Sequence, residues 1–170
     1  MGFSGQRDVK VVLLNVEPVE VTGENFVFQR GDARRMDGFR DGEFDVVFSN
    51  SVIEHVGGFK EQMQMAAEIR RVGKRYFVQT PNRYFPIEPH FLVPFFQFLP
   101  ERAQVFLVSH HSLGWYDRIR DYQAAVEVVR GIRLLNKQEL KRLFPEAHLQ
   151  KERFCGLTKS FIVYHGWNAV

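Results

Sequence analysis

The sequence has one cysteine and no long apolar run, and both scarcities restrict what the protein can be. Cys155 stands alone among the 170 residues, so neither an intrachain disulfide nor a zinc site with several cysteines can form. We expect a packed thiol there, and a cytoplasmic protein, because Met1–Asp8 shows neither the apolar core nor the cleavage pattern of a secretion signal. The longest apolar stretch, Phe91–Leu99, is far below the roughly twenty residues that a membrane-spanning helix needs.

The chain also has little excess charge of either sign. Lys and Arg together number 23 against 20 Asp and Glu, which gives a formal charge of +3. The basic residues are scattered, with the densest group at Arg70, Arg71, Lys74 and Arg75, as is usual for a solvated surface. We therefore predict no nucleic-acid partner. With 45% hydrophobic residues, 1–170 is long enough for one domain and too short for two.

Four short runs of β-branched, leucine and aromatic residues predict buried strands. They are Lys10–Val16, Phe26–Gln29, Phe44–Phe48 and Arg75–Gln79. Between the last two runs, apolar residues recur at helical spacing, and a glycine suited to ending a helix follows them. The order strand, helix, strand predicts a right-handed crossover and a parallel sheet, whose ligand sites lie at the carboxyl ends of the strands.

The last part of the chain predicts a capped helix and a hairpin. Asn136 with Glu139 three residues later forms a capping box before a helix that Pro145 closes. Leu149–Phe154 and Ser160–Tyr164 then pair as antiparallel strands. The expected fold class is therefore α/β, with a mostly parallel sheet and a C-terminal antiparallel hairpin.

Several short motifs occur in one order between Gly31 and Asn82. They are Gly31-Asp32-Ala33, Phe44-Asp45-Val46-Val47-Phe48-Ser49-Asn50, Ile53-Glu54-His55-Val56, Glu68-Ile69-Arg70-Arg71-Val72 and Thr80-Pro81-Asn82. In order and spacing they resemble class I, S-adenosylmethionine-dependent methyltransferases of the ubiquinone-biosynthesis and "type 11" small-molecule kind. The resemblance implies a Rossmann-like sheet and S-adenosylmethionine as the cofactor.

The resemblance also implies which strand ends hold the cofactor. An acidic residue at the end of the second family strand holds the ribose, and this chain has Asn15 there, with Glu17 as a substitute two residues on. Asp32 and Ala33 match the adenine position, although Asp32 also suits a turn cap. Ser49 and Asn50 match the loop beside the methionine part, and an ordinary helix cap before Val52 is the equal alternative.

The family's first strand and its glycine-rich loop have no counterpart before Lys10, so we expect an N-terminally truncated version of the fold. In this fold that strand lies near the middle of the sheet. We expect either direct pairing of Lys10–Val16 with Phe44–Phe48, or an edge supplied by a second copy in a homodimer.

The segment 83–130 is an aromatic-rich insertion at the place where the family carries its acceptor lid. We expect it to be helical and to cover a small-molecule acceptor that is apolar or aromatic, with Tyr84 and His90 as candidate substrate residues. A helical layer that only shields the sheet is the equal alternative. No carboxylate at ligand spacing marks the histidines of this segment as a metal site, so none is predicted.

His55 is the candidate general base, since a base assists methyl transfer to a hydroxyl. The competing interpretation makes Glu54 and His55 residues of a helix start that pack locally. The predicted function is methyl transfer from S-adenosylmethionine to a small molecule. The rival is a truncated, non-catalytic domain that acts through protein contacts.

Overall fold

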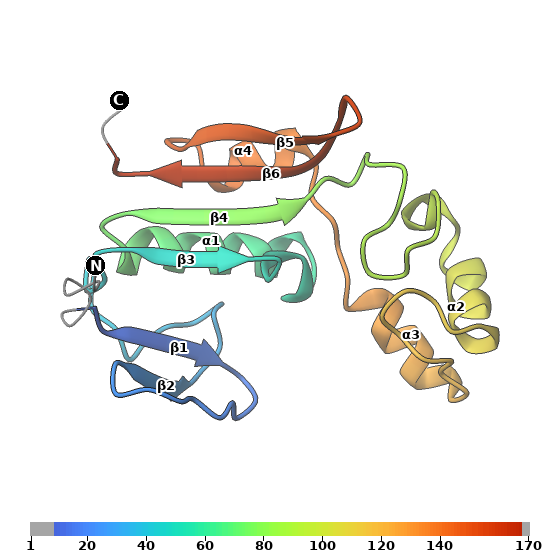
Figure 1. Cartoon of the computed structure of the whole chain (residues 1–170), viewed down its shortest axis with the longest axis horizontal. Coiled ribbons are helices and arrows are strands. Elements are labelled where there is room, and N and C mark those ends of the chain that lie inside the picture. Colours follow the sequence, from blue (N-terminus) through green and yellow to red (C-terminus); the bar gives the residue numbers. More distant parts are fainter. Residues whose placement is uncertain (1–8, 168–170) are drawn as a thin grey trace, which may run out of the picture.

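A computed structural model describes residues 9–167, and its strands form two separate sheets (Figure 1). The elements in chain order are β1 (Val11–Asn15), β2 (Phe26–Arg30), β3 (Val47–Asn50), the 3₁₀ turn η1 (Ile53–His55), α1 (Phe59–Val72), β4 (Tyr76–Pro81), η2 (Phe96–Phe98), α2 (Glu101–His110), α3 (Tyr122–Arg130), α4 (Lys137–Leu143), β5 (His148–Phe154) and β6 (Leu157–His165). The mixed α/β architecture confirms the predicted fold class.

Among residues 9–167, the smaller sheet consists of β1 and β2. The two strands are parallel, with Val11 opposite Phe26 and Asn15 opposite Arg30. The amide of Gly31 then donates to the carbonyl of Asn15 at 3.0 Å. A Cβ at Gly31 would lie 2.7 Å from Leu14 Cδ1, so the glycine lets the chain after β2 turn close against the end of β1.

The larger sheet has the order β3-β4-β6-β5, in which β3 and β4 are parallel and the other neighbours antiparallel. Helix α1 makes the predicted crossover from β3 to β4. The third strand lies later than the run that predicted it, at Val47–Asn50, because Phe44 makes only an isolated bridge to Gly73. The polar residues Ser49 and Asn50 therefore belong to the strand itself.

The main core lies on one face of this larger sheet. Helices α1 and α4 cover β4 and β6 there, and the buried side chains include Met65, Ala66, Ile69, Val72, Tyr76, Val78, Leu140, Leu143, Phe144, Phe161 and Val163. The predicted capping box is confirmed, since Asn136 Oδ1 accepts from the amide of Glu139 and the Glu139 carboxylate accepts from that of Asn136. Two short amphipathic helices thus complete a two-layer core.

Helix α1 ends at Gly73, where neighbouring atoms leave no room for a Cβ atom. The backbone of Gly73 is extended, with a φ of −98°, so a left-handed conformation is not what requires glycine. A Cβ at this position would lie 2.8 Å from Val47 Cγ2 and 2.9 Å from the carbonyl oxygen of Arg75. The glycine therefore brings the end of α1 close to the start of β3.

Direct pairing of β1 with β3, one of the two expected arrangements, is wrong for the described residues, since these strands belong to different sheets. A cavity of about 370 Å³ lies between them, with Leu13 and Leu14 on the β1 side and Val46 and Phe48 on the β3 side. Phe48 is 69% exposed. The parallel part of the fold is therefore divided by an apolar gap.

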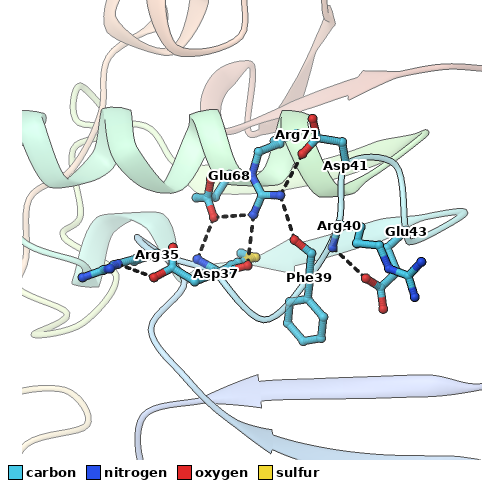
Figure 2. A network of polar contacts seen from close by, with 9 residues as sticks. Arg35, Asp37, Phe39, Arg40, Asp41, Glu43, Glu68 and Arg71 are labelled. Carbon is cyan, nitrogen blue, oxygen red and sulfur yellow. Dashed lines mark hydrogen bonds and ion pairs between the residues drawn. The ribbon is translucent and has the colours of Figure 1, made fainter.

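Polar contacts centred on Arg71 connect the loop after β2 to α1 (Figure 2). The Arg71 guanidinium donates to the carbonyls of Met36 at 3.0 Å and Phe39 at 2.8 Å, and to the carboxylates of Asp41 and Glu68. Glu68 Oε2 also accepts from the amide of Met36 at 2.6 Å. This group, which we call the Arg71 clasp, joins the β1–β2 side of the molecule to the larger sheet.

The segment 83–130 contains η2, α2 and α3, and has its own hydrophobic cluster. Phe91, Phe96, Val105, Val108, Ala125, Val126 and Val129 form its buried centre. It lies beyond the end toward which β1, β3 and β4 point (Figure 1). Whether it acts as a lid remains a prediction.

The antiparallel hairpin β5–β6 confirms the predicted end of the sheet, but Cys155 was misjudged. Cys155 and Gly156 form the turn between Phe154 and Leu157, and the cysteine is exposed rather than packed. Over the part of the chain that is described, no helix combines the length and the apolarity needed to cross a membrane.

Candidate cofactor and active site

A cavity of about 280 Å³ lies where β1 and β2 end. Four of the predicted site residues line it, namely Asn15, Asp32, Ala33 and His55. The strands are parallel, so their polar ends meet on one side, and the turn at Gly31 brings Asp32 next to Asn15. We call this hollow the strand-end cavity. Its walls are apolar, formed by Leu14, Val16, Val52 and Val56 among others.

Asp32 is engaged by the next arginine along the chain. Its carboxylate accepts from Arg34 Nε at 2.9 Å, from Arg34 Nη2 at 2.6 Å and from the Arg34 amide at 2.8 Å. These hydrogen bonds from Arg34 lower the pKa of Asp32, so the carboxylate is ionised at neutral pH. Arg34 Nη1 also donates to the carbonyl of Val56, across the same cavity. Asp32 therefore caps its turn while facing the hollow.

The side-chain oxygen Oδ1 of Asn15 accepts a hydrogen bond from the backbone N–H of Val16 at 2.9 Å, and Asn15 borders the cavity. Glu17, the predicted substitute for a ribose-binding carboxylate, is exposed and lies outside the cavity lining. The structure thus brings Asn15, and not Glu17, together with Asp32.

Ser49 and Asn50 line the neighbouring 370 Å³ cavity, which shares Leu14, Ala33 and Val52 with the strand-end cavity. Ser49 Oγ is buried and has no hydrogen-bond partner among the described residues. Such an atom costs free energy unless something else satisfies it. Ser51, which follows, holds a positive φ of 52° while donating its amide to the carbonyl of Gln79. Strain of this kind is common at functional sites.

His55 ends the turn η1 and lies beside a second histidine. His55 Nε2 is 3.1 Å from His90 Nε2, and His90 Nδ1 is 2.6 Å from the buried carboxylate of Glu88. The pKa of His55 is lowered, first by partial loss of surrounding water and then by the neighbouring His90 ring. A neutral imidazole is the form that accepts a proton. The expectation that His55 begins a helix is wrong, since α1 starts four residues later.

Glu54 is the most buried ionisable group near these histidines. Its side chain is fully buried, and Oε2 accepts from Thr80 Oγ1 at 3.0 Å while Oε1 has no partner among the described residues. Burial raises the pKa of Glu54 above the usual carboxyl value. A buried carboxyl with a shifted pKa beside two histidines is a feature of functional sites.

Of the two predicted substrate residues, His90 joins this cluster and Tyr84 does not. Tyr84 is exposed, stacks on Phe98 and borders a different hollow with Asn82 and Lys151. An apolar cavity of about 400 Å³ lies between the insertion and the ends of β3 and β4. Its lining includes Ser51, Gln79, Phe85, Ile87, Leu92 and Trp115.

Three residues that shape the site are not predicted from the sequence, namely Arg34, Glu54 and Glu88. Glu88 stands two residues before His90, a spacing that would have paired them in a turn. Glu54 was treated as a partner of His55 in local packing. Its burial against Thr80 of β4 depends on tertiary contacts that the sequence alone does not give.

Part of the chain matches a known family model. Residues 7–76 match the family model described as "Methyltransferase domain". Proteins Rv1509 and MT1557 of two Mycobacterium tuberculosis strains are each 31% identical to this chain over 98 residues. That match covers 48% of this chain and 33% of each relative, so the chain spans about a third of the curated relatives it matches.

Solved structures share the fold at low sequence identity. The PH0226 protein from Pyrococcus horikoshii is similar over 91% of this chain and 70% of its own, with a TM-score of 0.51 and 18% identity. The complex of LepI with S-adenosylmethionine matches 91% of this chain and 36% of its own, with a TM-score of 0.50 and 8% identity. Residues 7–76 are thus similar to a methyltransferase domain, and the chain shares its fold with these solved structures.

Proposed function

We propose that the chain binds S-adenosylmethionine in the strand-end cavity and transfers its methyl group to a small, largely apolar acceptor. The observation that carries the proposal is the convergence of Asn15, Asp32 and Ala33, from two parallel strands, around one hollow. The bound cofactor would supply the reactive sulfonium methyl group, so the protein has to align donor and acceptor.

The cavity fits a nucleoside in its distribution of polar and apolar groups. A carboxylate and an amide stand at its rim, and aliphatic walls suit a flat base between them. Asp32 would accept from the adenine amino group and Asn15 from a ribose hydroxyl. For Asp32 to do so, one of the hydrogen bonds that the Arg34 guanidinium donates to its carboxylate has to break.

The methionine part would extend toward Ser49 and Asn50 in the adjoining cavity. Ser49 Oγ lacks a partner there among the described residues, and an amino-acid group would supply one. The acceptor would occupy the 400 Å³ cavity beneath the insertion 83–130, whose lining is mainly aromatic and aliphatic. That lining supports an apolar or aromatic acceptor. His55 remains the predicted base, and Tyr84 the predicted substrate residue.

Calorimetric titration with S-adenosylhomocysteine tests the cofactor part. We expect Asp32→Ala to weaken binding about tenfold or more, equivalent to about 1.4 kcal/mol. Asp37→Ala is the matched control, because that carboxylate pairs with Arg35 on the exposed surface outside the cavity. Equal affinity of Asp32→Ala and the wild type would remove the adenine assignment. A folded wild-type chain that binds no cofactor would overturn the proposal and favour the rival non-catalytic domain.

A further inference from the structure

Three potential metal ligands meet between the strand-end cavity and the insertion. One ligand atom each from Glu54, His55 and His90 lies within 4.8 Å of the other two. We propose that these three side chains bind one divalent transition-metal cation of the zinc type, with a coordination position left open. No metal site is predicted from the sequence, because no carboxylate stands at ligand spacing from the histidines of the insertion, and Glu54 comes next to His90 only in the fold.

His90 is already oriented as a metal-binding histidine. Glu88 is 2% exposed, and its Oε1 lies 2.6 Å from His90 Nδ1 while its Oε2 accepts from the amides of His90 and Phe91, each at 2.7 Å. With Glu88 as the acceptor of these contacts, His90 Nδ1 donates and His90 Nε2 presents a lone pair. A carboxylate behind the ring is the usual support of a metal-bound imidazole.

The separation of the two imidazoles suits a shared cation. With metal–nitrogen distances of about 2.0 to 2.1 Å, two ligand nitrogens lie about 2.9 Å apart at a right angle and about 3.3 Å apart in a tetrahedron. The observed distance between His55 Nε2 and His90 Nε2 is 3.1 Å. His55 is exposed and can adjust its ring, so the pair can accept a cation with small movements.

Glu54 supplies the independent observation. Its Oε1 is completely buried and has no hydrogen-bond partner among the described residues, although Thr80 holds the other oxygen. An unpaired buried carboxyl oxygen beside two imidazoles is costly, and a cation would satisfy it. Two imidazoles with one carboxylate leave a tetrahedral ion one open position.

The donor set indicates the class of cation and of additional ligand. Imidazole nitrogen together with carboxylate oxygen suits zinc and neighbouring divalent metals better than magnesium or calcium, which prefer oxygen alone. His55 lines the strand-end cavity, so the open position lies near the predicted cofactor, where an oxygen of the acceptor is the ligand it would take. That last step rests on the proposed function, and cation binding itself does not. A His55 ring that binds the cation through Nε2 would not also act there as the base, so these two roles of His55 are alternatives.

The test is direct titration of the untagged full chain with Zn²⁺, without cofactor, against a chromophoric chelator. We expect one cation per chain, and Co²⁺ in its place to give the visible absorption of low-coordinate nitrogen and oxygen ligands. His55→Gln and His90→Gln should each weaken binding by at least about 100-fold, and Glu88→Gln by about 10- to 100-fold. His55 is exposed, so its variant is expected to fold, and thermal unfolding checks the others.

His110→Gln is the matched control, because His110 is an exposed histidine of the same segment whose ring lies 2.8 Å from the carbonyl of Phe106 and outside the three-ligand cluster. It should bind Zn²⁺ like the wild type. Absence of binding by the wild type, or unchanged affinity of both His55→Gln and His90→Gln, would overturn the proposal. A loss in His110→Gln as large as in His55→Gln would also overturn it, because binding would then be scattered over surface histidines. A parallel cofactor titration separates this result from failure of the proposed function.

Discussion

The two sheets of this protein differ in how far apolar burial stabilises each of them. In the larger sheet, β4 is buried along most of its length between neighbours on both sides, and two helices pack on one face. In the smaller sheet, four of the five residues of β2 are exposed, and β1 pairs with one strand of the described part of the chain. The larger sheet therefore gains most from apolar burial and the smaller one gains little.

The connection between the sheets combines apolar packing of Leu14, Met36 and Phe39 against the main core with polar contacts to α1. The backbone hydrogen bonds of β1 and β2 join these two strands to each other. The Arg71 clasp joins α1 to the loop after β2. Because the strand-end cavity takes residues from β1, β2 and the η1 region, its shape depends on this clasp. The site thus draws residues from both sides of the junction between the two sheets.

The largest expected difference between the two sheets is the cost of truncating an apolar side chain. Leu140→Ala should lower the free energy of unfolding by about 2 to 5 kcal/mol, because Leu140 is 0% exposed in the main core and its removal leaves a cavity. Val27→Ala in β2, where the side chain is 41% exposed, should cost less than about 1 kcal/mol. Urea unfolding measures both. Equal costs would show that the smaller sheet is as well buried as the larger one.

A smaller effect is expected from the clasp. Arg71→Met should cost about 1 to 3 kcal/mol, because two carbonyls and the Glu68 carboxylate lose a charged donor. Amide hydrogen exchange should also rise at Met36, whose N–H donates to Glu68. Arg35→Met is the control, since its ion pair with Asp37 is exposed, and it should cost less than about 0.5 kcal/mol. Similar exchange at Met36 in both variants would refute the role of the clasp.

Acid should weaken the clasp in the wild type. The Arg71 hydrogen bond lowers the pKa of Glu68 below its usual value. A lowered carboxyl pKa contributes stability that is fully present above the unfolded value and is lost as the pH falls through the folded one. The stability difference between wild type and Arg71→Met should therefore shrink below about pH 4.

Much of the fold was predictable because its signals are local. The capping box at Asn136, the turn glycine at position 156 and the helical spacing of Met65 and Ile69 each specify a structure within a few residues. The division into two sheets was not predictable from local signals. Whether β1 pairs with β3 depends on tertiary structure, and here an apolar cavity lies between the two strands. The later start of β3, at Val47, is not predicted because Phe44 is apolar yet makes only an isolated bridge outside the ladder.

The candidate site was predictable where it consists of strand ends. Asn15, Asp32 and Ala33 meet because parallel strands end on one side. The cluster of Glu54, His55 and His90 was not predicted, because it joins residues 35 positions apart through the folded path of the insertion. Exposure of Cys155 was also missed, since a lone cysteine is more often buried and only the turn places it outside.

The smallest expected effect has the opposite sign and lies in the hairpin of the larger sheet. Cys155 has a positive φ of 48° and is followed by Gly156 at 79°, the pattern of a two-residue turn in which asparagine followed by glycine is preferred. Cys155→Asn should therefore raise the free energy of unfolding by under about 1 kcal/mol, whereas Cys155→Val should lower it, because a β-branched residue is strained in this conformation. Thermal unfolding of the two variants measures the difference. A gain from valine would show that the ladder between β5 and β6, and not the turn, sets the local backbone.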